Sequence, residues 1–177
     1  MTETCPDLAE EFSRRCSAWS DIVEYLPLLH GYARVYQGCR ILEVGVRSGN
    51  STVALLYAAQ ITGGHLWSVD IDDVLARGDG MGPWADHPAW TFTRGHSTGT
   101  GTLAKQPVAV DLFFLDSDHG YDITRAEIRA YMPRLAPGGT ALFHDTRLPC
   151  GDAEAPGGRY PVTAALDEYC GDRKSVV

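Results

Sequence analysis

Carboxylates and histidines gather at two places in the second half of the chain. Asp116 is followed three residues later by His119, and His144 stands directly before Asp145. Both pairs come at the end of an apolar run, where a buried strand would finish. Neighbouring ends of a parallel sheet lie side by side, so the two aspartates would repel each other unless a cation or a proton lay between them. The pattern predicts a divalent-metal site with a histidine general base, the alternative being turn-forming aspartates.

A glycine-punctuated stretch at residues 40–56 offers a second chemistry. Its first half is an apolar β-type run that contains one carboxylate, Glu43. Gly45 and Gly49 follow, and residues 50–52 (Asn-Ser-Thr) can cap the start of a helix. Strand, glycine turn and helix in this order favour a bound ligand, because glycine allows close approach and a helix N-terminus presents unpaired N–H groups. An ordinary buried strand with a turn is the alternative.

The glycine spacing indicates the kind of ligand. A dinucleotide-binding turn would read G-x-G-x-x-G, whereas this stretch reads E-x-G-x-x-x-G from Glu43 to Gly49. The Glu43 carboxylate would repel a pyrophosphate but attract a ligand with a cationic amino group. An NAD-dependent oxidoreductase is an alternative for a sheet of this kind, and the turn argues against NAD as the cofactor.

Asp70 ends another strand-like run, residues 65–70. Ligands of parallel α/β sheets lie outside the carboxyl ends of the strands, so a carboxylate here could accept hydrogen bonds from both hydroxyls of a ribose. A helix N-cap is the alternative, because Asp72 and Asp73 crowd the same turn. The strand-end position favours the ribose role.

The elements that must position these residues follow from the periodicity of the chain. Helical patterns alternate with β-type runs at 41–44, 65–70, 90–94, 110–115 and 140–144. This order predicts an α/β fold with a doubly wound, mostly parallel, Rossmann-like sheet and helices on both faces, in a single domain over residues 1–177.

The ends of the chain carry further helical patterns. Phe12 and Trp19 are expected to anchor a lead-in segment, and residues 27–36 form a helix that packs on the sheet. A helix at 161–170, stopped by Gly171, leaves room for at most one short strand after it. The last strand then has an open edge, and open edges are usually covered, which predicts a homo-oligomer.

Composition narrows the function. A net charge of −8 and a pI near 5.1 argue against nucleic acid as a partner, and no apolar run approaches a membrane span. The N-terminus shows no signal pattern, and the five scattered cysteines form no metal or disulfide spacing. We expect a cytoplasmic protein with a small-molecule substrate. The Gly- and Pro-rich residues 77–88 are typical of a lid.

The stretch from Glu43 to Gly49 resembles motif I of the class I S-adenosylmethionine-dependent methyltransferases. The resemblance implies S-adenosyl-L-methionine as cofactor, with Asp70 on its ribose and Ser97, after the third strand, at the adenine edge. The residues implied around its methionine moiety are Glu43, Gly45, Arg47, Gly49 and Ser51.

Residues 114–121 and 137–146 look like the metal-dependent O-methyltransferases, namely the catechol and macrolide-sugar types close to the cephalosporin-hydroxylase-like branch. The resemblance covers about residues 21–147. It implies that Asp116, which also borders the cofactor, binds the metal with His144 and Asp145, and that His119 is the base. An imidazole at position 144 departs from the usual oxygen ligand and suits Mn²⁺, Fe²⁺ or Zn²⁺ better than Mg²⁺. The alternative is that His144 is not a metal ligand.

The combined reading is metal-assisted O-methylation of a hydroxyl on a small molecule. Three alternatives stay open: a catalytically silent S-adenosylmethionine-binding protein that needs a partner, an NAD-dependent oxidoreductase, and a metal-dependent hydrolase or hydroxylase.

Overall fold

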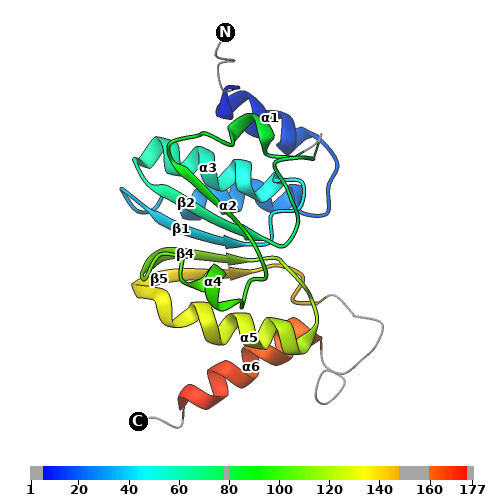
Figure 1. Ribbon diagram of the computed structural model, residues 1–177, viewed down its shortest axis with the longest axis vertical. Helices are drawn as coiled ribbons and strands as arrows, with labels where there is room; N and C mark the ends of the chain where they lie inside the picture. The colour runs from blue at the N-terminus through cyan, green and yellow to red at the C-terminus, as the bar shows by residue number, and fades with distance from the viewer. Residues whose placement is uncertain (1–5, 78–79, 148–159, 175–177) are drawn as a thin grey trace.

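The protein is a three-layer sandwich in which a parallel sheet lies between two groups of helices (Figure 1). The computed structural model describes residues 6–77, 80–147 and 160–174. The sheet order is β3-β2-β1-β4-β5 with every pairing parallel, which confirms the predicted fold class. The strands are β1 (Arg40–Val44), β2 (His65–Asp70), β3 (Trp90–Arg94), β4 (Val110–Leu115) and β5 (Leu135–Phe143).

Helices cover both faces of the sheet (Figure 1). On one face lie α1 (Leu8–Ser17), α2 (Leu26–Ala33) and α3 (Asn50–Thr62); on the other lie α4 (Thr100–Leu103), α5 (Tyr121–Tyr131) and α6 (Pro161–Lys174). Short 3₁₀ turns complete the elements: η1 (Val23–Tyr25), η2 (Gly82–Trp84) and η3 (Met132–Arg134).

The core is divided by the sheet because successive strand residues point to opposite faces. Ile41 and Phe114 belong to the cluster under α1–α3, whereas their chain neighbours Leu42 and Phe113 belong to the cluster with Tyr131 of α5. The central strands β1 and β4 are buried on both sides, so they read as continuous apolar runs.

The N-terminal expectations are partly corrected. Phe12 packs against the rings of His30 and Tyr57 as an anchor, but Trp19 is 93% exposed and anchors nothing. Trp19 follows the last turn of α1 and lies beyond the face that this helix packs on α3.

The expected lid does not lie over the strand ends in the described part of the loop. Met81 and Trp84 are buried in the core cluster on the α1–α3 side, and the indole N–H of Trp84 donates to the carbonyl of Pro6. Burial of two large apolar side chains holds this segment against the helices.

The C-terminal region differs from the prediction in two ways. β5 begins at Leu135, before the predicted run at 140–144, and a register shift between Val110 and Leu112 accommodates the additional residues. α6 continues past Gly171 to Lys174. Its Glu168 accepts a hydrogen bond from Arg129 of α5 at 2.7 Å, which ties the two helices together.

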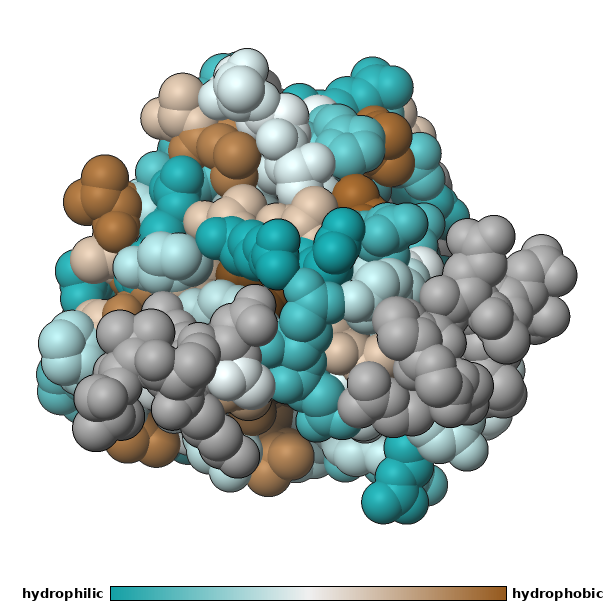
Figure 2. All heavy atoms as spheres, turned by 90° about the horizontal axis from the view of Figure 1, so that it is seen from below, coloured by the Kyte–Doolittle hydropathy of each residue, from teal (hydrophilic) through white to brown (hydrophobic). Residues whose placement is uncertain are grey.

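No described helix has both the length and the apolar character needed to cross a membrane. On the face shown in Figure 2, hydrophilic and hydrophobic residues are interspersed over the part of the surface that is coloured.

Candidate active site

The turn between β1 and α3 lies directly against the end of β4. Gly45 has a φ of +97°, and a Cβ atom added to it would lie 2.0 Å from the backbone oxygen of Asp116. Only glycine fits this approach. Arg47, two residues later, also has a left-handed backbone (φ 53°), and its guanidinium donates to Asp21 at 2.6 Å.

Glu43 lies beneath this turn. Its carboxylate is fully buried and accepts hydrogen bonds from Ser51 (2.6 Å), Thr52 (2.8 Å) and Ser68 (2.7 Å). Burial raises the pKa of Glu43 to about 7, although the three hydroxyl donors lower it. Glu43, predicted to surround the methionine moiety, therefore does not line the cavity described next and acts on it through Ser51.

A cavity of about 390 Å³ opens at the carboxyl ends of the strands, where parallel α/β sheets bind ligands. Gly49 is not on its wall, because it packs against the thioether of Met81. The structure brings most of the predicted site residues together here: Gly45, Arg47, Ser51, Asp70, Ser97, Asp116, His119 and Asp145.

Asp70 accepts hydrogen bonds from the backbone of two turns. Its Oδ2 accepts the backbone N–H groups of Val46 (2.7 Å) and Arg47 (2.9 Å), which fixes the glycine turn. Its Oδ1 accepts the N–H of Asp72 (2.9 Å), as a turn-forming aspartate does. Because each carboxylate oxygen can accept a further bond, Asp70 also remains available to a ligand in the cavity that it lines.

Several cavity residues were missed from the sequence, among them Glu127 and Ser117. Glu127 of α5 is 1% exposed and accepts a bond from the hydroxyl of Ser117, with distances of 2.8 and 2.7 Å to its two oxygens. A signal was present, because Glu127 follows Thr124 by three residues and precedes Tyr131 by four, and both are buried on α5. That spacing places the carboxylate in line with the apolar face of the helix.

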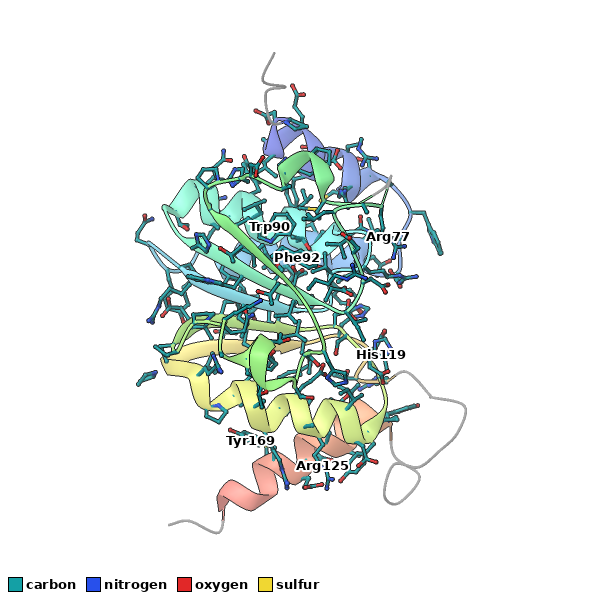
Figure 3. All side chains as sticks on the ribbon, in the orientation of Figure 1. Arg77, Trp90, Phe92, His119, Arg125 and Tyr169 are labelled. Carbon is teal, nitrogen blue, oxygen red and sulfur yellow. The ribbon has the colours of Figure 1, made fainter. Side chains whose placement is uncertain are left out.

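The four predicted metal and base residues form one cluster beside the cavity. The Nε2 atom of His119 lies 3.0 Å from Asp145 Oδ2 and 3.5 Å from Asp116 Oδ1. The Nδ1 atom of His144 lies 3.2 Å from Asp116 Oδ1 and 3.3 Å from Asp145 Oδ2. Figure 3 shows His119 where β4 and β5 end, next to the first turn of α5.

Electrostatics couple these groups. Burial raises the pKa of Asp116, but hydrogen bonds and the charges of His119 and His144 outweigh it and bring that pKa to about 2. The same hydrogen bonds to Asp116 are the main reason that the pKa values of both histidines are raised, against the lowering effect of burial. Asp145 has a left-handed backbone (φ 50°), an uncommon conformation for a residue other than glycine and one found at functional sites.

The cluster fits a divalent cation. One ligand atom from each of Asp116, His144 and Asp145 lies within 4.8 Å of the others. The buried Nδ1 of His144 is close to both carboxylates, but it has no well-oriented hydrogen bond with the described residues. A cation would engage this nitrogen and relieve the repulsion between the carboxylates.

The chain belongs to the methyltransferase domain family, whose profile matches residues 42–146. The matched region runs from β1 to just past the His144–Asp145 pair and so includes the cavity and the cluster. This confirms the prediction of a methyltransferase. No curated protein matches the chain.

Solved structures share the fold at low sequence identity. MycE methyltransferase from the mycinamycin biosynthetic pathway, solved with Mg and SAH, has a TM-score of 0.67 at 19% identity, over 97% of this chain and 50% of MycE. An O-methyltransferase from Bacillus cereus, solved with SAH, has a TM-score of 0.66 at 16% identity, over 98% of this chain and 82% of that protein. The methyltransferase PaMTH1 of Podospora anserina, also bound to SAH, has a TM-score of 0.65 at 18% identity, over 96% of this chain and 80% of PaMTH1.

Proposed function

We propose that this chain transfers a methyl group from S-adenosyl-L-methionine to a hydroxyl oxygen of a small molecule, with help from a divalent cation. The observation that carries the proposal is that the cation-binding cluster and the cavity share residues. Asp116 and Asp145 belong to the cation-binding cluster and also line the cavity that the glycine turn forms. A donor in that cavity would therefore lie next to an acceptor held at the cluster.

The cavity residues suit the parts of this donor. The turn residues Gly45, Arg47 and Ser51 would surround its methionine moiety, Asp70 its ribose and Ser97 its adenine edge. The donor supplies an electrophilic methyl group on a sulfonium. The protein's contribution is positioning, since a methyl transfer needs the acceptor oxygen, the methyl carbon and the sulfur in line.

Asp116, His144 and Asp145 would hold the cation, and the imidazole favours Mn²⁺ or Fe²⁺ over Mg²⁺. Such an ion supplies positive charge that makes a nearby hydroxyl more acidic. His119 would take the hydroxyl proton. Its Nε2 lies 3.0 Å from Asp145, so its ring is held at the cluster where the acceptor would lie.

Binding to S-adenosylhomocysteine, the demethylated form of the donor, tests the proposal. At 100 times its Kd it should raise the free energy of unfolding by about 2.7 kcal/mol, measured by thermal shift, whereas NAD should leave it unchanged. A shift with NAD, or none with S-adenosylhomocysteine, would remove the donor from the proposal. The homocysteine moiety alone serves as a control, because it lacks the groups that Asp70 and Ser97 would contact.

We also propose a cytoplasmic homo-oligomer that acts on small hydroxylated molecules and binds no nucleic acid. β5 is an edge strand of the sheet, and beside it a groove of about 620 Å³ is lined by Tyr25, Leu28 and Leu142 among others. Tyr25 and Leu28 are about half exposed. Covering such an edge with a second copy would bury these side chains.

A further inference from the structure

A buried arginine lies behind the glycine turn. Arg15, in the last turn of α1, is 5% exposed, although a guanidinium carries a permanent charge and is rarely buried without partners. Its Nε atom donates to Glu11 of the same helix at 2.7 Å, and its Nη1 atom donates across to the turn. Arg15 itself does not line the cavity, and the proposed function gives it no role.

The contacts of the Nη1 atom reach two residues that do line the cavity. This atom donates to the backbone carbonyl of Ser48 at 2.7 Å and to Oδ1 of Asn50 at 3.0 Å. Ser48 and Asn50 flank Gly49, where the backbone is left-handed and α3 begins without a side-chain cap. One guanidinium therefore fixes the residues on both sides of the glycine, the residue with the greatest backbone freedom in the turn.

The hydrogen bond from Arg15 also decides how the amide of Asn50 is oriented. An arginine side chain has only donors, so the amide atom that meets it must be the oxygen. The amide nitrogen carries two hydrogens and donates to the hydroxyl oxygen of Ser48 at 3.4 Å, which leaves one hydrogen for a ligand. Asn50 therefore offers a donor to the cavity that it lines.

We propose that Arg15 is a positioning residue, which orients Asn50 so that its amide N–H₂ meets the carboxylate of the methyl donor's amino-acid tail. The inference rests on the proposed function, which places the methionine moiety at this turn. Without the guanidinium, the amide could turn its oxygen toward the carboxylate, and two acceptors would face each other. The turn would also lose the bond to the Ser48 carbonyl that holds it to α1.

The test compares S-adenosylhomocysteine with 5′-methylthioadenosine, which keeps the nucleoside and the sulfur but lacks the amino-acid tail. In Arg15→Met, calorimetry should show affinity for S-adenosylhomocysteine reduced roughly tenfold or more, the usual worth of a hydrogen bond to a charged group. Affinity for 5′-methylthioadenosine should stay within about threefold of wild type, because no tail is present to lose a contact. Arg15→Lys retains a charged donor and should bind S-adenosylhomocysteine more tightly than Arg15→Met does.

A neighbouring residue provides the matched control. Arg14 pairs with the same Glu11 but is exposed on the surface of α1, so Arg14→Met should bind both ligands as wild type does. An equal loss of affinity for both ligands in Arg15→Met would show a residue that only supports the fold. Unchanged affinity for S-adenosylhomocysteine would show that the guanidinium does not position the turn. Either result would overturn the inference.

Asn50→Asp decides the question if Arg15→Met fails to fold. This substitution keeps an oxygen for Arg15 and replaces the amide N–H₂ by a second oxygen, so a carboxylate would meet the carboxylate of the tail. Affinity for S-adenosylhomocysteine should again fall roughly tenfold or more, with 5′-methylthioadenosine bound as before. Equal affinity of Asn50→Asp and wild type, or an equal loss for both ligands, would overturn the inference. Failure of wild type to bind either compound would instead remove the donor from the proposed function.

Discussion

The Nε2 atom of His119 lies 3.0 Å from the Oδ2 atom of Asp145, although the two residues come from loops after different strands. β4 and β5 are neighbours in the sheet, so their ends bring these loops together. The contact joins a histidine that can move a proton to a carboxylate of the cation-binding cluster. Proton transfer and cation binding are therefore expected to depend on the same few atoms.

His119→Ala should lower kcat by roughly 10²–10⁴-fold, the usual worth of a positioned general base, with an acceptor found by screening hydroxylated compounds. Affinity for S-adenosylhomocysteine should stay within about threefold of wild type. His65→Ala is the matched control, because His65 begins β2 at the opposite end of the sheet and should not affect kcat. Full activity in His119→Ala would show that another group accepts the proton of the hydroxyl.

Removal of divalent cations should abolish methyl transfer. We expect Mn²⁺ or Fe²⁺ to restore more activity than Mg²⁺, because His144 offers a nitrogen ligand. Asp145→Ala should lose Mn²⁺ affinity in calorimetry while it still binds S-adenosylhomocysteine. Methyl transfer at the full rate in the presence of a chelator would show that Asp116 and Asp145 only form turns and bind no catalytic cation.

Asp70→Ala should weaken S-adenosylhomocysteine binding by about 1.5–3 kcal/mol, since charge-assisted bonds to the ribose would be lost. Part of the loss would come from the glycine turn, whose N–H groups at Val46 and Arg47 lose their acceptor. Calorimetry is the measurement, and Asp73→Ala, an exposed partner of Arg94, is the control. Equal affinities for wild type and Asp70→Ala would leave Asp70 with only its turn-forming role.

The stability of the fold should depend on pH through Glu43. Its pKa rises from 4.5 to about 7 on folding, so the folded state binds the proton more tightly than the unfolded state. The stabilisation from this proton is complete below about pH 4.5 and is lost as the pH rises through about 7, a change on the order of 3 kcal/mol. Urea unfolding from pH 4.5 to 8 should show a larger loss in wild type than in Glu43→Gln, in which only the other groups with raised pKa values, Glu127, His119 and His144, still contribute. Parallel pH profiles for the two proteins would contradict it.

Light scattering should show a homodimer or a larger oligomer at working concentrations. Leu28→Asp places a charge in the groove beside β5 and should shift the protein toward monomer. Val108→Asp is the control, because Val108 is 90% exposed and does not line that groove. A monomeric wild-type protein, or equal dissociation by both variants, would rule out this interface.

The sequence by itself determined the sheet and the place of its chemistry. Apolar runs such as the one before Asp116 are long enough only for buried strands, and parallel strands bring their ends to one edge. That argument was sufficient to predict the cavity at Asp70 and the cluster of Asp116 with Asp145. The glycine spacing likewise predicted a turn that lies close to other backbone, which Gly45 confirms with its approach to Asp116.

Only the tertiary structure decided which side chains face the cavity. Glu43 follows the strand alternation into the core, where hydroxyls from α3 and β2 surround it, and no local pattern shows those partners. Met81 covers Gly49 from a loop whose composition indicated a lid. Glu127 reaches the cavity because α5 packs on the sheet through Tyr131, which contacts Phe113 of β4, and because Ser117 after β4 binds its carboxylate. Contacts between segments distant in the chain depend on how helices pack on the sheet, and local periodicity does not encode that packing.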